Sequence, residues 1–140
     1  MRPNLPATSL IVATLTTVIV AACTLREMPV ADEGAQVYAA NCTTCHGPSG
    51  KGDGPLSAEL PRKPADLTRI AARNGGTFPV AKTLSVIDGY ARGSNEGRIM
   101  PEFGAVLGSN TVPLKVNGTL TPTPRPLAAL LAYLEAIQTP

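Results

Sequence analysis

Apolar residues recur at helical spacing near both ends of the chain. In residues 32–41, Gly34, Val37 and Tyr38 fall at positions i, i+3 and i+4, which form one face of a helix. A second stripe with the same period runs through residues 127–138 and consists of Leu127, Leu130, Leu131 and Leu134. The pattern therefore predicts one amphipathic helix at each end.

Shorter helical segments are expected between these two. The sequence predicts a short turn of helix over Leu56 to Leu60, and helices over Leu67 to Arg73 and Val80 to Tyr90. Asp66 can cap the second segment, and Asn74-Gly75-Gly76 can end it, because these residue types tolerate the left-handed backbone conformation.

Residues 108–124 follow a different pattern. Short apolar and β-branched segments flank Asn117-Gly118, which is a strong signal for a two-residue hairpin turn. We therefore expect a small β-hairpin or an ordered loop here. The following prolines, which are Pro122, Pro124 and Pro126, predict an extended run before the last helix.

The N-terminal residues read as a targeting segment. Residues 10–22 are uncharged and apolar, too short for a comfortable membrane span, and end in small residues, which is typical of a secretory signal peptide over residues 1–22. An uncleaved anchor helix is the alternative.

The signal ends in Val20-Ala21-Ala22-Cys23, which resembles a bacterial lipobox and would make Cys23 the lipidated N-terminus. The alternative is an ordinary cleavage site with a leftover thiol. Residues 23–31 would then form a tether, whose last eight residues reach at most about 28 Å.

The remaining residues, 32–140, have the length of one domain. The net charge of the chain is only +2, Trp is absent, and no basic cluster occurs, so nothing indicates nucleic-acid binding. Cysteine and histidine are scarce, with three Cys and one His in the chain.

Two of these cysteines and the histidine form one motif, Cys42-x-x-Cys45-His46. This spacing is the signature of covalent c-type haem attachment, in which two thiols add to the haem vinyl groups and the histidine binds iron. A thioredoxin-like dithiol would need a βαβ pattern around it, which is not visible. A zinc site would need a second ligand pair, which the sequence lacks.

On this motif, a Met100-Pro101 pair and a helix at each end, the chain resembles the class I c-type cytochromes over residues 32–140. The resemblance implies an all-α cytochrome c fold of three to five short helices around one covalent haem c. It also implies that Gly34 and Tyr38 pack against Leu130 and Tyr133 of the last helix. The hairpin segment departs from the usual family pattern.

The resemblance also concerns the iron ligands. In the family a proline carbonyl after the haem histidine accepts a hydrogen bond from that ring. Pro55 is our candidate here, and Pro48 is the alternative.

Met100 is the candidate sixth ligand, because Met1 is lost with the signal, Met28 lies in the tether, and no second His exists. The alternative is Met100 as core filler beside an open iron.

These expectations point to a one-electron carrier rather than an enzyme. It would exchange electrons with redox proteins in a periplasmic respiratory or dehydrogenase-linked chain, held by its lipid on an inner or outer bacterial membrane. One alternative is a dedicated haem subunit of a membrane oxidoreductase complex. Another is a haem-based sensor with a displaceable sixth ligand.

Overall fold

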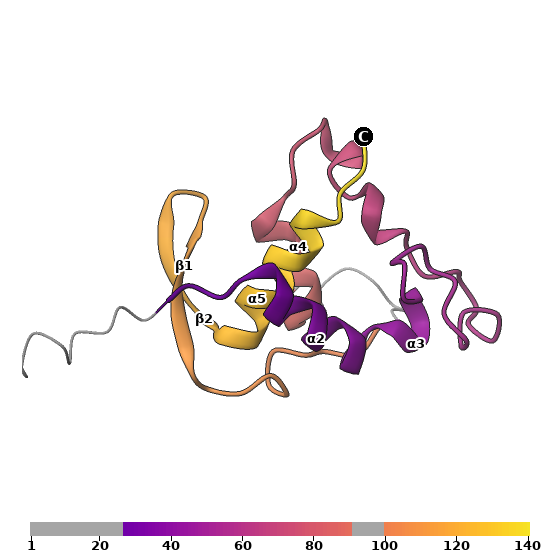
Figure 1. Cartoon of the computed structure of the whole chain (residues 1–140), viewed down its shortest axis with the longest axis horizontal. Helices are drawn as coiled ribbons and strands as arrows, with labels where there is room; N and C mark the ends of the chain where they lie inside the picture. Colours follow the sequence, from indigo (N-terminus) through magenta and orange to yellow (C-terminus); the bar gives the residue numbers. More distant parts are fainter. Residues whose placement is uncertain (1–26, 91–99) are drawn as a thin grey trace, which may run out of the picture.

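Two helices from opposite ends of the sequence cross at the centre of the molecule (Figure 1). The computed structural model describes residues 27–90 and 100–140, and within it α2 spans Ala31–Asn41 and α5 spans Arg125–Ala136. Gly34 lies at the crossing, where an added Cβ atom would overlap the backbone carbonyl of Ala129 and lie 2.7 Å from Tyr133 Cβ. The predicted terminal helices and their contact through Gly34 are therefore confirmed.

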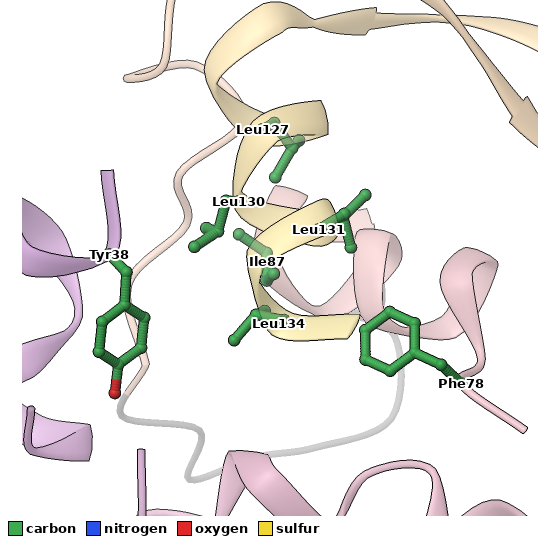
Figure 2. Close-up of a cluster of buried hydrophobic side chains, with 7 residues drawn as sticks. All are labelled: Tyr38, Phe78, Ile87, Leu127, Leu130, Leu131 and Leu134. Atoms are coloured by element: carbon green, nitrogen blue, oxygen red, sulfur yellow. The ribbon is translucent and has the colours of Figure 1, made fainter. Parts of the chain in front are cut away.

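The hydrophobic core forms around α5. Tyr38 stacks at a tilt on Tyr133, with ring centroids 5.1 Å apart and planes at 43°. In Figure 2, the α5 leucines lie between Tyr38 on one side and Phe78 on the other. The buried cluster consists of Tyr38, Phe78, Ile87, Leu127, Leu130, Leu131 and Leu134.

The middle of the chain contributes short elements that wrap around this core. They are α3 (Thr43–His46), the 3-10 turns η1 (Leu67–Arg69) and η2 (Ala72–Asn74), and α4 (Val80–Asp88). The helix expected over 56–60 is wrong, since these residues form turns and bends. α4 ends two residues earlier than expected, because Gly89 adopts φ 103° and leaves the helical conformation.

The helix expected over 67–73 is also wrong, although Asp66 caps the segment as predicted and accepts from Thr68 N at 2.9 Å. In an α-helix, Ala71 N would donate to Leu67 O. Here the side chain of Gln138 takes both groups, accepting from Ala71 N and donating to Leu67 O, each at 2.8 Å. The C-terminal segment thus replaces the helical hydrogen bond, and the segment becomes two 3-10 turns.

The predicted β-hairpin is present. β1 (Thr111–Val116) pairs antiparallel with β2 (Thr119–Pro124). The turn residues Asn117 and Gly118 both have positive φ, 50° and 86°, which matches the right-handed twist of the strands. The expected extended run is corrected at its end, because Pro126 lies in the first turn of α5, where a missing N–H costs nothing.

No helix in residues 27–90 and 100–140 is long and apolar enough to cross a membrane. The expected signal peptide, residues 1–22, and the expected lipidation site, Cys23, lie outside the described residues.

Candidate functional site

A cavity of about 320 Å³ lies between the core and the segment that follows α2. Its walls are mainly apolar and come from α2, the motif, the segment 65–87, Met100 and α5. The apolar lining includes Leu67, Ile70, Val86, Ile87, Leu130 and Leu134. Such a concave, mainly apolar space with a few polar groups is typical of a site for a small molecule or a cofactor.

The C-x-x-C-H motif forms one wall of this cavity. Cys42 ends α2, with its N–H donating to Tyr38 O at 2.9 Å, and the short helix α3 follows directly. Cys42 and His46 both line the cavity. Cys45 is half-buried, unoxidised and not part of the lining. Helix α2 therefore positions the motif at the cavity, since the motif directly follows the C-terminal end of this helix.

The His46 ring is held by one backbone hydrogen bond. Its Nδ1 lies 3.1 Å from the carbonyl oxygen of Ala65, which can only accept, so Nδ1 carries the proton. Ala65 thus provides the acceptor that we had assigned to Pro55, and the Pro55 assignment is wrong. This bond leaves the lone pair of Nε2 free to bind a metal.

The protonation state of His46 suits the same role. Burial lowers the pKa of His46 below its ordinary value, and the hydrogen bond to Ala65 opposes this only partly. The neutral imidazole is the form that coordinates metals. Burial also raises the pKa of the Cys42 thiol to about 11, with a smaller effect from Cys45, so this thiol is neutral at pH 7.

The glycine-rich loop after His46 brings Ala65 to the ring. Gly52 N donates to His46 O at 2.9 Å, and Leu67 N donates to Gly50 O at 2.6 Å. Gly52 has φ 73°, and an added Cβ would lie 2.9 Å from the Pro64 carbonyl carbon. The segment before η1, which contains Pro64 and Ala65, therefore packs directly on the loop. The sequence analysis did not identify this contact between the loop and the segment before η1, although the closely spaced glycines were the available signal.

Met100 lines the same cavity and is half-buried. The chain after it is anchored to α4, since Phe103 N donates to Ile87 O at 2.9 Å. Ile87 itself lines the cavity and belongs to the core cluster. The structure therefore brings the thioether of Met100 to the same cavity as Cys42 and His46, from a segment more than 50 residues further along the chain.

Two basic side chains also line the cavity, Arg73 and Lys82, and both residues are exposed. Of the basic residues that follow the motif before α4, namely Lys51, Arg62, Lys63, Arg69 and Arg73, the lining includes Arg73 alone. Arg73 also donates to Asp66 O at 2.8 Å, which holds it in place. Sequence reasoning missed Lys82, because it lies on α4, far from the motif along the chain.

These residues fit a haem. The cavity offers apolar walls, a thiol and a neutral imidazole on one wall, a thioether, and cations at the solvent-exposed side. Cations there suit the two carboxylates of a haem, which need solvent or counter-charges. Cys45, the second thiol of the motif, lies on the same short helix as His46.

Tyr38 links the first helix to the motif and gives a first testable prediction. Its buried hydroxyl donates to Gly47 O at 2.6 Å, next to His46. Tyr38→Phe is expected to lower the free energy of unfolding of the holoprotein by about 0.5–1.5 kcal/mol, because the Gly47 carbonyl loses one of its two donors and keeps only Gly50 N at 3.2 Å. Urea unfolding measures this change. Tyr133→Phe is the control, since it keeps the ring contact and alters a half-buried residue.

The same hydroxyl predicts a pH dependence. Burial raises the pKa of Tyr38 from 10.0 to about 12, with smaller contributions from nearby charges. The folded state therefore favours the neutral phenol, and this stabilisation is complete below about pH 10 and is lost as the pH rises toward 12. Tyr38→Phe should reduce the loss of stability in this range. An unchanged alkaline unfolding curve would contradict the prediction.

Comparisons with known proteins agree with this geometry. The family model for cytochrome c matches residues 31–138. The chain is also 31% identical over 87 residues to the cbb3-type cytochrome c oxidase subunit FixP of Azorhizobium caulinodans. That match covers 61% of this chain and 25% of the relative, so the chain corresponds to about a quarter of that protein. No solved structure matches the chain.

Proposed function

The chain belongs to the cytochrome c family, and on this premise we propose that it is a one-electron carrier with His46 and Met100 as iron ligands. Its cofactor is a covalent haem c, as in the family, and Cys42 and Cys45 are the proposed attachment sites. One observation carries the proposal: Cys42, His46 and Met100 line a single apolar cavity.

The residues of the chain have separate roles in this proposal. Bound haem supplies reversible one-electron exchange at its iron. Ala65 holds the His46 ring through Nδ1, so that Nε2 is left free to bind the iron in a fixed ring orientation. Met100 would hold the iron through its thioether, which would leave no site for a substrate there. Leu130, Leu134 and Ile87 exclude water, which limits the reorganisation that accompanies electron transfer.

The first experiment compares optical spectra of the oxidised and reduced holoprotein and then adds carbon monoxide to the reduced form. We expect the weak far-red band of a thioether–Fe(III) bond and no reaction with carbon monoxide. A missing band together with rapid carbon monoxide binding would reject Met100 ligation and favour the sensor alternative.

Met100→Ala tests the same ligand directly. Loss of the thioether should remove the far-red band, open the iron to carbon monoxide and lower the reduction potential, since a Met ligand raises it. Met28→Ala is the matched control, because Met28 is 44% exposed and lies before α2. A Met100→Ala protein whose spectrum and potential equal those of the native protein would contradict the assignment.

A second candidate function is a dedicated haem subunit of a membrane oxidoreductase complex. The similarity to an oxidase subunit favours it. Purification from membranes in mild detergent distinguishes the two functions. A carrier is expected to purify without other proteins, whereas a subunit copurifies with its complex in a fixed ratio.

We place the domain on the periplasmic side of a bacterial membrane, attached through a lipid on Cys23. The sequence before residue 27 supports this placement through its apolar run and lipobox-like end. Mass spectrometry of the mature N-terminus tests it, because a diacylglyceryl-modified cysteine has a distinct mass. Cys23→Ser should release the protein from the membrane while the haem remains bound.

A further inference from the structure

The β-hairpin presents one face to the core and one to solvent. Cross-strand partners point to the same side of a hairpin, and successive pairs alternate between the two faces. Val112 and its partner Thr123 are buried against the body of the domain. The alternate pairs face outward. Their exposed members are Thr111, Pro113, Lys115, Leu120 and Pro122.

The edges of the hairpin are closed to strand addition. Pro113 and Pro122 are direct partners in the hairpin and have no N–H. They occupy a non-hydrogen-bonded pair, in which the N–H of another residue type would point away from the partner strand. Each outer edge therefore lacks a donor at its middle. Natural sheets use edge prolines in this way to prevent pairing with other strands. Any contact must therefore involve the outward face, where Leu120 is 65% exposed.

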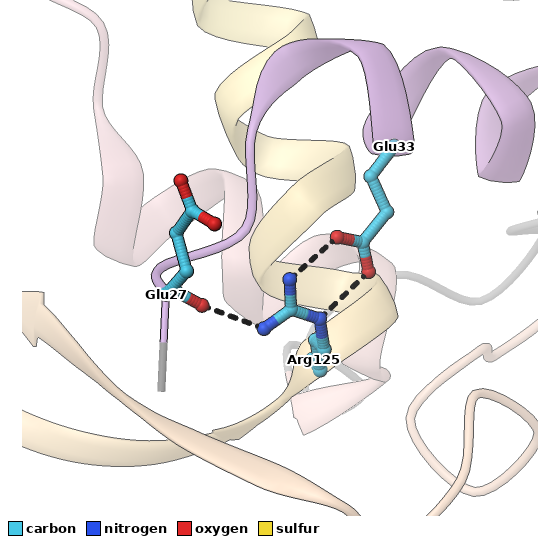
Figure 3. Close-up of polar contacts among 3 residues, drawn as sticks. All are labelled: Glu27, Glu33 and Arg125. Carbon is cyan, nitrogen blue, oxygen red and sulfur yellow. Dashed lines mark hydrogen bonds and ion pairs between the residues drawn. The ribbon is translucent and has the colours of Figure 1, made fainter. Parts of the chain in front are cut away.

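The N-terminal segment leaves the domain beside this hairpin. Arg125, the first residue of α5 after β2, donates to both carboxylate oxygens of Glu33, at 3.0 and 2.9 Å. The same guanidinium donates to the backbone oxygen of Glu27 at 2.7 Å (Figure 3). Glu27 follows the proposed lipid anchor, Cys23, by four residues, which reach at most about 14 Å.

The chemistry of this end suits a lipid surface. The sequence between Glu102 and Glu135 contains no acidic residue, and Lys115 is the charge on the hairpin. Met28 and Val30, in the segment clamped by Arg125, are 44% and 54% exposed. Exposed apolar residues, among them Leu120 opposite Lys115, match the apolar part of a bilayer interface.

The cavity lies away from this end. β2 leads into the start of α5, whereas the α5 residues that line the cavity, Leu130 and Leu134, lie at its middle and in its second half. A helix of 12 residues is about 18 Å long. In Figure 1, the hairpin and the N-terminal segment lie toward one end of the long axis and α3 lies toward the other.

We propose that the outward face of the hairpin and residues 27–30 form a membrane-contact surface. This inference rests on the proposed lipid anchor. The anchor alone would let the domain rotate, whereas contact through the hairpin orients it. The haem-binding end then faces the aqueous side, where redox proteins can reach it.

Site-directed spin labelling tests the contact on the full mature holoprotein. The native cysteines are taken by the lipid and the haem in this proposal, so an added cysteine carries the label alone. A nitroxide is attached at Leu120→Cys on the hairpin. The matched control is Leu56→Cys, because Leu56 is 40% exposed and lies in the loop after the motif. The reduced proteins are reconstituted on vesicles of phosphatidylethanolamine and phosphatidylglycerol.

Collisions of the nitroxide with oxygen, which concentrates in lipid, and with a water-soluble nickel chelate report the environment of each label. We expect reconstitution to shift the label at position 120 toward oxygen and away from nickel, whereas the label at position 56 stays water-like. A water-like label at position 120 on vesicle-bound protein would overturn the proposal. The outward face of the hairpin would then be a candidate surface for a protein partner.

Failure of the protein to sediment with the vesicles would also overturn the membrane contact. The optical spectrum of each labelled protein reports the haem and its ligands independently. A normal spectrum with a water-like label at position 120 thus rejects the contact surface alone. An abnormal spectrum before labelling rejects the electron-carrier function instead.

Discussion

Cys42→Ser together with Cys45→Ser is expected to abolish covalent haem attachment and to leave the chain largely unfolded. The reason is the cavity of about 320 Å³ beside the core, because without haem this space would be left unfilled between residues of the core. At about 24 cal/mol per Å³, an empty space of this size would cost about 8 kcal/mol. This figure is an upper value, since the cavity is partly open to solvent.

A domain of this size has a total stability of about 5–15 kcal/mol. The loss is therefore comparable to the whole free energy of folding. The described part of the chain also contains few long elements, since α4 has 9 residues and α3 has 4. The haem thus supplies packing surface that the side chains do not provide alone.

Two measurements check this prediction. Haem staining of the denatured protein reports covalent attachment, and far-ultraviolet circular dichroism with thermal unfolding reports the fold. Cys23→Ser is the control, because it removes a thiol outside the proposed site and should keep the haem. A double variant with native helical signal and cooperative unfolding would show that the chain folds without its cofactor.

Gly34→Ala is expected to destabilise the protein, and the sign of the change in the free energy of unfolding tests the close crossing of α2 and α5. Helix propensity alone favours Ala over Gly by about 1 kcal/mol. In α2, however, the new Cβ would overlap the Ala129 carbonyl, a backbone group that cannot rotate away. We therefore expect a net loss of about 1–3 kcal/mol, as for other overpacked sites.

The readout is the urea midpoint of the holoprotein. The matched control is Ala40→Gly, an exposed position on the same helix, which should cost about 1 kcal/mol through propensity alone. A movement of α5 away from α2 would also displace Leu130 and Leu134 from the cavity, so the spectrum should change in Gly34→Ala. A stabilised Gly34→Ala protein would contradict the close crossing.

Features whose cause lies within a few residues could be predicted from the sequence. Asn117-Gly118 specifies its own turn, since both residues tolerate positive φ. Asp66 caps η1 by accepting a hydrogen bond from Thr68 N, two residues away. The same holds for the C-x-x-C-H spacing, because one turn of helix places Cys42 and His46 on the same wall of the cavity.

Two of the wrong predictions involve partners that are distant in sequence. Gln138 takes the hydrogen-bonding groups of Leu67 and Ala71, and no local pattern in residues 67–73 signals this. The His46 acceptor is Ala65, 19 residues away, because the glycine loop folds against it. A proline near the motif was a reasonable candidate, but proximity along the chain does not decide which carbonyl reaches the ring.

Residue type and short spacing were sufficient to predict the thiols, the imidazole and the thioether, together with the helices at the ends and the hairpin turn. These features depend on interactions within one or two turns of chain. Three contacts could be seen only in the folded molecule: Met100 lines the cavity with His46, Ala65 orients the ring, and Arg125 binds the N-terminal segment beside the hairpin. The physical reason is that each of these contacts joins distant segments, whose meeting depends on how the whole core packs.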